Sequence, residues 1–129
     1  MDSLLVAKVA AEAAKERKAH DVVILDVRSV TLMADYFVIS SGRTPVQTRA
    51  IADRVIEKVK GKKKPYLHRE GYDRGRWILL DYGDVVVHVM HQSERDFYNL
   101  ERIWGDASIV ELDGEIATDK YFSPGAGKP

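Results

Sequence analysis

Residues 37–47, FVISSGRTPVQ, could form a phosphate-binding turn, because a glycine lies between a predicted strand and the start of a predicted helix. Backbone N–H groups at such a junction can point towards an anion. The segment lacks the lysine of a P-loop and the three glycines of a dinucleotide-binding turn. A single glycine here is more often a turn residue that needs a positive φ angle. Two interpretations therefore stay open, a structural turn and the remnant of a ligand site.

Phosphoryl transfer with two metal ions would need carboxylates that converge on those ions. Nucleotidyltransferases follow a Gly-Ser turn and a helix with a strand that bears two carboxylates one residue apart. The corresponding strand here, residues 84–88, has Asp84 but Val86 in the second position, and Asp84 and His88 lie more than ~10 Å apart along a strand. Asp81, on the neighbouring strand, could at best help to bind a single cation. We therefore predict that the chain is not an enzyme and has no cofactor or metal site.

The four histidines form no catalytic constellation either. His88 lies among valines and is expected to be a satisfied core or interface histidine rather than a base or a ligand. His68 and His91 have no partner at the spacing of a zinc-binding helix. Ser40 and Ser41 do not lie in the nucleophile elbow of a hydrolase.

A predicted hairpin over residues 77–90 is the strongest candidate for a binding site. Side chains alternate along a strand, so if Ile78 and Leu80 enter the core, Trp77 and Asp81 face outward together. A tryptophan beside acidic residues is a credible anchor for a basic protein surface. The alternative, that Trp77 packs beneath a helix, fits the sequence equally well.

The elements that must position these residues follow from apolar periodicity, β-branched runs and capping residues. We predict a helix over residues 3–18 capped by Ser3, strands over 21–27 and 35–40, and a helix from Thr44-Pro45 to Gly61. Strands over 77–81 and 84–90 follow, joined at Tyr82-Gly83. A last helix is capped by Ser93 and ends at Gly105, and a short edge strand lies within 107–112. The inward residues of the second helix are expected to be Val46, Ala50, Ile51, Val55 and Val59, and those sharing a face of the last helix Phe97, Leu100 and Trp104. This order predicts an α/β fold with a mixed β-sheet flanked by helices.

Length and composition favour one globular domain, residues 1–112, followed by a tail over residues 113–129 that is rich in glycine and proline and expected to be flexible. The chain has no cysteine, which excludes disulfides and thiolate metal sites and fits a reducing compartment. No apolar run approaches the ~20 residues that span a bilayer, and the first residues do not resemble a signal peptide. We therefore expect a cytoplasmic protein with no membrane partner.

The net charge is zero, but the charge is unevenly distributed along the chain. Residues 58–76 contain eight Lys and Arg against two acidic residues, whereas residues 81–118 contain nine acidic residues against two arginines. A purely electrostatic nucleic-acid binder would be basic overall. Contact with both a basic protein and nearby phosphates would suit this polarity. The simpler alternative is that the run from Lys62 to Lys64 is a solvated connector.

Several runs of this sequence resemble the ribosomal silencing factors, also called the Iojap family. They are DVVILDV, ADYFVISSG, Gln47 with AIAD, Glu70-Gly71, GRWILLDYGDVVVHV and RDFYNLERIWGDA. These runs extend over about residues 4–107, in the order and at the spacing of the family. The most specific is WILLDYGDVVVHV followed by an aromatic-rich helix that ends in LERIW.

The resemblance implies a nucleotidyltransferase-like α/β fold that lacks the catalytic carboxylates. It also implies binding to the large ribosomal subunit through its protein fourteen, which would block association with the small subunit and lower translation when nutrients are limiting. The matching contact positions are Trp77, Asp81 and Tyr82, with Gly83 and Asp84 shaping the turn. Nearby ribosomal RNA contact and a homodimer of the free protein are further expectations.

Two alternatives use the same residues in other ways. One is an adaptor that binds the large subunit during its assembly. The other is a nucleotidyltransferase relative with residual activity on Ser41, Asp81 and Asp84, which Val86 argues against.

Overall fold

The computed structural model describes residues 2–99, 105 and 107–110. The elements in chain order are α1 (Ser3–Glu16), β1 (His20–Asp26), β2 (Tyr36–Gly42), α2 (Pro45–Gly61), β3 (His68–Glu70), β4 (Trp77–Asp81), β5 (Val85–His91), α3 (Gln92–Tyr98) and β6 (Ser108–Ile109). The strands form one sheet of six in the order β3-β4-β5-β2-β1-β6. The predicted α/β fold with a mixed sheet is confirmed.

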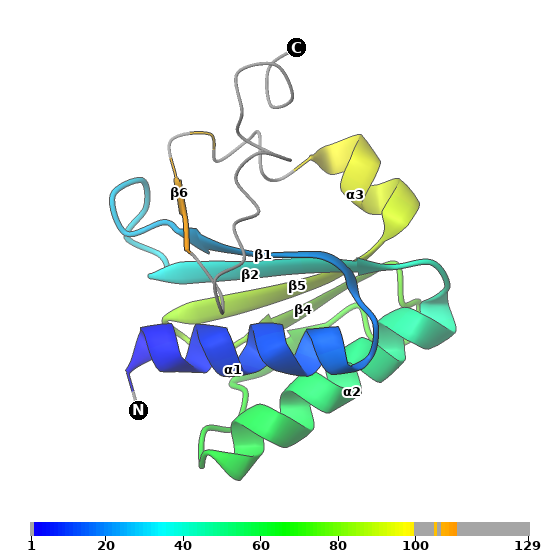
Figure 1. Cartoon of the computed structure of the whole chain (residues 1–129), viewed down its shortest axis with the longest axis horizontal. Coiled ribbons are helices and arrows are strands. Elements are labelled where there is room, and N and C mark those ends of the chain that lie inside the picture. The colour runs from blue at the N-terminus through cyan, green and yellow to red at the C-terminus, as the bar shows by residue number, and fades with distance from the viewer. Residues whose placement is uncertain (1, 100–104, 106, 111–129) are drawn as a thin grey trace.

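The sheet is mixed because the antiparallel strands β3, β4 and β5 join the antiparallel strands β2, β1 and β6 through one parallel pairing. β1 and β2 pair antiparallel, as do β3 with β4 and β4 with β5, whereas β2 and β5 run parallel at the centre. α2 makes this possible, since it carries the chain back along the sheet after β2. Figure 1 shows α1 and α2 together under one face of the sheet, with α3 on the opposite side.

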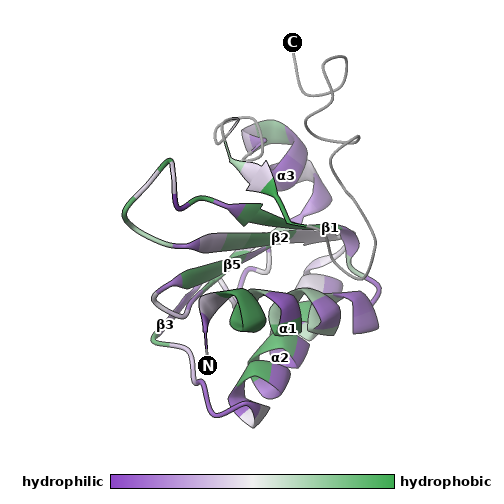
Figure 2. Ribbon diagram, turned by 60° about the vertical axis from the view of Figure 1, so that its left-hand side comes forward, coloured by the Kyte–Doolittle hydropathy of each residue, from purple (hydrophilic) through white to green (hydrophobic). Residues whose placement is uncertain are grey.

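The main core lies between the sheet and the helix pair α1 and α2. The buried face of α1 is rich in alanine, including Ala7, Ala10, Ala11 and Ala14. Small side chains let the helix approach both the sheet and α2 closely. Figure 2 shows how strongly the apolar residues concentrate in the strands.

The N-cap of α1 differs from the prediction. Asp2 caps the helix, and its carboxylate accepts a hydrogen bond from the Leu5 N–H at 2.8 Å. Ser3 is the first helical residue, and its hydroxyl instead donates to the Asp35 carboxylate at 2.8 Å. Aspartate is as good an N-cap as serine, so the sequence pattern alone could not separate the two.

The predicted start of α2 is confirmed, but one inward residue is wrong. Thr44 caps the helix and accepts from the Gln47 N–H, and Pro45 occupies the first turn. Ile51, Val55 and Val59 are buried, whereas Val46 is 70% exposed. The buried face is completed by Thr48 and Ala52, with Ala50 partly buried. Val46 does not belong to this set because it lies outside the i, i+3, i+4 series that Thr48, Ile51, Ala52 and Val55 follow.

The predicted hairpin and the edge strand are both present. β4 and β5 are joined by residues 82–84, and β6 pairs antiparallel with β1 at the edge of the sheet. The short strand β3 was not predicted. It contains three exposed residues and therefore has no alternating apolar pattern to reveal it.

The last helix begins and ends differently from the prediction. His91 is the N-cap of α3, and its Nδ1 accepts from the Ser93 N–H at 3.2 Å, so Ser93 is not the cap. The helix ends at Tyr98, because Asn99 adopts a left-handed conformation with φ of 49°. Phe97 is exposed. The predictions for Leu100, Trp104 and the tail over 113–129 lie outside the described residues.

Candidate functional site

The candidate site lies on the outer face, which is the side of the sheet turned away from α1 and α2. On β4, Ile78 and Leu80 are fully buried towards the helices, whereas Trp77, Leu79 and Asp81 point to the outer face and stay partly exposed. The predicted alternation along this strand is therefore confirmed. It places the indole and the carboxylate on the same side of the sheet.

Trp77 is half-buried in a ring cluster that it forms with His88, Tyr98 and Phe37. Its indole N–H donates to Nδ1 of His88 at 3.1 Å, and its ring lies 5.0 Å from that of Tyr98 in α3. Each of the two sequence interpretations was thus partly right. Trp77 faces outward from the sheet, and it also packs beside a helix.

His88 lies on the adjacent strand β5 and accepts the hydrogen bond from the Trp77 indole. It is 6% exposed, and Phe37 packs against it edge-on with ring centroids 5.0 Å apart. Burial lowers the pKa of His88 to about 4, so the ring is neutral at physiological pH. Because Nδ1 accepts the indole proton, the ring proton must be on Nε2, which is buried and has no hydrogen-bond partner among the described residues. The predicted burial of His88 is confirmed, but only one of its two ring nitrogens is satisfied by the residues that the structure describes.

The turn after β4 is organised by Asp81. One oxygen of its carboxylate accepts from the Gly83 N–H at 2.7 Å, and the Tyr82 N–H donates to the Val85 carbonyl at 2.8 Å. Gly83 has a φ of 89°, a conformation that glycine adopts without strain. The Asp84 side chain is exposed beyond the turn. Asp81 therefore shapes this end of the hairpin as well as presenting negative charge.

Tyr82 does not lie where a contact residue would. Its side chain continues the inward series of Ile78 and Leu80 and is only 1% exposed. The hydroxyl is buried, with no hydrogen-bond partner in the part of the chain that the structure describes, and burial raises the pKa of the phenol. The structure corrects the inclusion of Tyr82 among contact side chains, because the alternation that turns Trp77 outward turns Tyr82 inward.

β3 extends the outer face at the edge of the sheet, and sequence reasoning missed it. His68 lies opposite Asp81 in the pairing of β3 with β4, and its Nε2 is 2.6 Å from the Glu70 carboxylate. The Leu67 N–H donates to the Asp81 carbonyl at 2.8 Å. The edge strand thus adds an exposed polar pair next to the hairpin.

The strand–SSG–helix segment favours the structural interpretation. The Gln47 amide oxygen accepts from the Arg43 N–H at 2.8 Å, and Thr44 Oγ1 accepts from the Gln47 N–H at 3.0 Å. These two backbone groups are therefore already occupied by side chains of the chain itself. Gly42 does not need a positive φ angle. Its role is close packing, since a Cβ there would lie 3.1 Å from Thr48 Cγ2.

The carboxylates near the hairpin do not converge. Asp81 lies opposite Val86 in the pairing of β4 with β5, and Asp84 belongs to the turn. Within the described residues, no group of three or more His, Asp or Glu side chains could hold a metal ion. In that same part of the chain, no helix is long and apolar enough to cross a membrane.

The outer face is buried in a second hydrophobic cluster over β1, β2 and β5, and it is partly exposed at β4, where a ring cluster and carboxylates meet as in a protein-binding surface. Comparison with known proteins makes the assignment specific. The family model described as "Ribosomal silencing factor during starvation" matches residues 1–125. The chain belongs to this family.

Individual relatives agree with the family model. The chain is 42% identical over 113 residues to a ribosomal silencing factor of Bacillus subtilis, covering 88% of this chain and 96% of the relative. It is 45% identical over 111 residues to that of Halalkalibacterium halodurans, covering 85% and 94%. A crystal structure of a Chromobacterium violaceum protein superposes with a TM-score of 0.79 at 35% identity, covering 81% of this chain and 88% of that one.

A more distant relative has a name that refers to assembly. It is the "Mitochondrial assembly of ribosomal large subunit protein 1" of Mus musculus, 30% identical over 108 residues. The match covers 81% of this chain and 47% of the mouse protein.

Proposed function

We propose that this protein binds the large ribosomal subunit through the outer face of β4 and the turn at residues 82–84, and that it contacts the subunit's protein fourteen there. The proposal rests on membership of the silencing-factor family and on one structural observation. That observation is the partly exposed Trp77, held by His88 and Tyr98 on the same strand face as Asp81.

The arrangement suits recognition of a basic protein surface. The Trp77 ring is already fixed by a hydrogen bond and a ring contact, so binding loses little side-chain entropy. Leu79 adds a partly exposed apolar group between Trp77 and Asp81. Asp81 and Asp84 place negative charge at the end of the hairpin, where it would attract cationic side chains.

The proposed mechanism needs no catalysis, cofactor or metal. A domain seated where the small subunit docks occupies volume that the small subunit requires, so association falls in proportion to occupancy. Such a protein would act in the cytoplasm as a repressor of translation under nutrient limitation. In the same proposal the fold is a nucleotidyltransferase-like one without the catalytic pair, and the free protein pairs with itself as a homodimer.

Co-sedimentation in sucrose gradients with separated subunits tests this proposal. The protein should travel with large subunits, not with small subunits, and should lower the full-ribosome peak when purified subunits are mixed. Equal recovery with both subunits would indicate non-specific RNA binding and contradict the proposal.

Trp77→Ala provides the sharpest variant for that experiment. Loss of an interface tryptophan commonly costs on the order of 2–4 kcal/mol, or ~30- to 1000-fold in affinity. Because Trp77 is also the hydrogen-bond donor to buried His88, thermal unfolding must be measured on the same sample. A variant that is folded and still binds with parental affinity would show that Trp77 is not the anchor.

A second candidate function, assistance in assembly of the large subunit, is favoured by the name of the mouse relative. Mature purified subunits separate the two roles. An assembly adaptor would leave their association unchanged, whereas a silencing factor would inhibit it.

A further inference from the structure

The loop over residues 27–35, between β1 and β2, displays two apolar side chains to solvent. Leu32 is 103% exposed and Met33 is 84% exposed, the highest values among the large hydrophobic residues that the structure describes. A single exposed leucine is ordinary on a protein surface. Two adjacent apolar side chains at the tip of a loop expose a larger contiguous apolar area, and what that area can contact depends on the residues beside it.

The loop is held in place by its own hydrogen bonds. The Val27 N–H donates to the Asp35 carbonyl at 2.9 Å, which closes the base of the loop, and the Thr31 N–H donates to the Val27 carbonyl at 3.0 Å. The Met33 N–H donates to the Thr31 hydroxyl at 3.1 Å. Hydrogen bonds therefore fix the backbone that exposes Leu32 and Met33.

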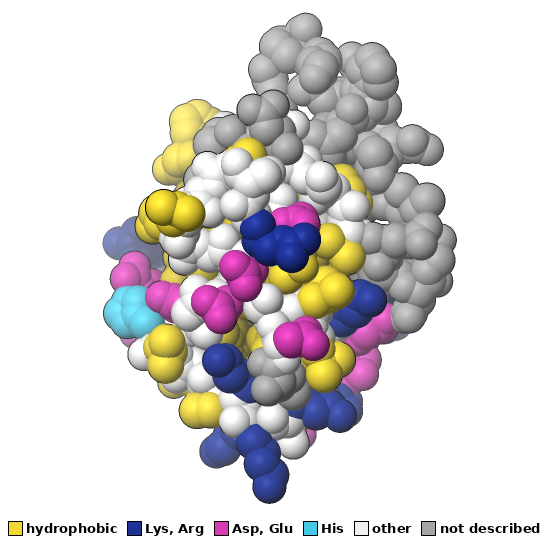
Figure 3. Space-filling model, turned by 90° about the vertical axis from the view of Figure 1, so that its left-hand side faces the viewer, with side chains coloured by type: hydrophobic (Ala, Val, Ile, Leu, Met, Phe, Trp, Pro, Cys, Tyr) yellow, Lys and Arg dark blue, Asp and Glu magenta, His cyan; other side chains and the backbone are white. Residues whose placement is uncertain are grey.

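The loop adjoins the hairpin turn of the proposed binding face. The N–H groups of Asp35 and Tyr36 both donate to the Asp84 carbonyl, at 2.7 and 3.2 Å. On the other side of the turn, Leu67 is 72% exposed and lies over Gly83, where a Cβ would come within 3.5 Å of its Cδ1. Figure 3 looks onto this end of the molecule and shows hydrophobic, acidic and basic side chains next to one another.

We propose that Leu32, Met33 and Leu67, here called the apolar rim, form a second contact with the ribosomal protein that the outer face binds. The rim would enter an apolar recess of that protein with cationic side chains at its border. This inference rests on the proposed function and names further residues that determine which partner the same site binds.

The charge around the rim favours a protein over RNA as the occupant. Asp81 ends β4, Asp84 lies in the turn between the loop and Leu67, and Asp35 lies at the base of the loop. The one basic residue of the loop, Arg28, is paired with Asp26 at 2.7 Å. Phosphates would be repelled by the carboxylates around the rim, whereas lysine or arginine side chains would be attracted. Apolar side chains between carboxylates therefore match an apolar patch that is bordered by basic residues.

The double substitution Leu32→Ser and Met33→Ser tests the inference. Both side chains are exposed, so the variant should unfold at the parental temperature. Its affinity for purified large subunits should fall at least about tenfold, measured by co-sedimentation at graded concentrations. Val46→Ser is the matched control, because Val46 is 70% exposed but lies at the start of α2, beyond the other end of β2. The control should bind within about twofold of the parent.

The outcomes separate this inference from the proposed function. If the parent does not bind large subunits, both fail. If the parent binds and the double variant binds equally well, only the apolar rim is wrong. A variant that loses self-association but keeps subunit affinity would make the rim a contact between copies and overturn the inference. The weakened binding should also persist at high salt, because the substituted side chains are apolar. A defect that disappears at high salt would mean that the loop acts through charge and would overturn the inference.

Discussion

At the scale of single residues, Asp81 combines two tasks that substitutions can separate. One carboxylate oxygen holds the Gly83 N–H, and the negative charge faces the proposed partner. An asparagine can keep the hydrogen bond but not the charge, whereas an alanine keeps neither.

Asp81→Asn should therefore weaken subunit binding while leaving the free energy of unfolding within about 0.5 kcal/mol of the parent. Asp81→Ala should weaken binding and also cost about 1 kcal/mol of stability, because the turn loses its side-chain acceptor. Chemical denaturation and co-sedimentation on both variants measure the two effects. Parental binding by Asp81→Asn would mean that the charge is not recognised.

Tyr82→Phe tests the corrected position of the tyrosine. Removing a buried hydroxyl that has no partner among residues 2–99, 105 and 107–110 should leave stability unchanged or raise it by about 1 kcal/mol. Subunit binding should not change, since the side chain does not reach the surface. A folded Tyr82→Phe protein with weakened binding would return the residue to the contact surface.

His88 predicts an acid-sensitive contribution to stability. The unfolded chain takes up a proton near a pKa of 6.5, whereas the folded protein resists protonation down to about 4. The unfolded state thus binds more protons between these values, and stability falls by roughly 3 kcal/mol as the pH drops through that window. This contribution does not vary with pH above 6.5.

The comparison variant is His88→Leu, which cannot titrate. Its free energy of unfolding, measured by denaturant titration at several pH values, should decline less steeply between pH 6.5 and 4 than that of the parent. Parallel pH profiles would show that His88 is protonated as readily in the folded state as in the unfolded one.

At the scale of elements, the sequence was informative wherever one face of an element is buried. The Thr44-Pro45 start of α2, the two strands of the hairpin and the orientation of Trp77 all follow from local patterns. The neighbours of Trp77 do not, because His88 and Tyr98 come from other elements and meet it only through tertiary packing. Equally, nothing local indicates that the exposed Leu32 and Met33 border the same turn.

The β3–β4 connection depends on one glycine that can be tested. Gly71 has a φ of 77°, and a Cβ there would clash with the Trp77 carbonyl oxygen. Gly71→Ala should therefore cost more than about 2 kcal/mol of stability and displace the start of β4. Gly61→Ala is the control, because nothing lies within 4 Å of its added Cβ and α2 favours alanine. Equal thermal stability of the two variants would contradict this role of Gly71.

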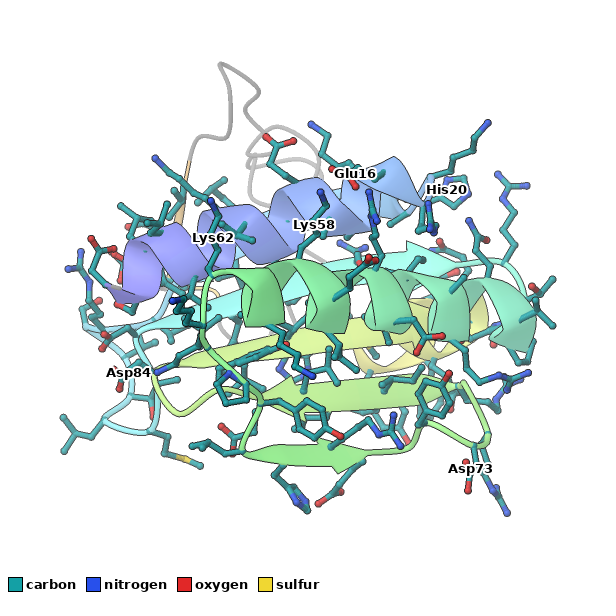
Figure 4. The ribbon with its side chains drawn as sticks, turned by 90° about the horizontal axis from the view of Figure 1, so that it is seen from below. Glu16, His20, Lys58, Lys62, Asp73 and Asp84 are labelled. Carbon is teal, nitrogen blue, oxygen red and sulfur yellow. The ribbon has the colours of Figure 1, made fainter. Side chains whose placement is uncertain are left out.

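At the scale of the whole molecule, the lysines that end α2 lie at the same end of the domain as the hairpin turn. Figure 4 shows Lys62 and Asp84 at one end, with His20 and Asp73 at the other. Lys62 and Lys63 are exposed and Lys64 is partly so. A protein contact at the turn would thus leave these lysines free to approach RNA phosphates beside it.

Replacing Lys62, Lys63 and Lys64 by glutamine should weaken subunit binding modestly and flatten its dependence on salt. The slope of log affinity against log salt should decrease by about one unit for each phosphate that the lysines no longer neutralise. Binding titrations at several salt concentrations measure the slope. An unchanged slope would mean that the run is a solvated connector.

The parallel pairing of β2 with β5 has a consequence for how the domain forms. β1 pairs with the next strand β2, and β3, β4 and β5 pair in chain order, whereas β6 pairs with β1 from a distant part of the chain. The groups β1–β2 and β3–β4–β5 join when residues 36–42 meet residues 85–91. Such distant pairing is slow compared with hairpin formation. The ring cluster spans this junction, because Phe37 comes from β2 and His88 from β5. The surface that we propose for recognition is therefore among the last parts to take shape as the chain folds, and a truncated or nascent chain that stops before β5 would not display it.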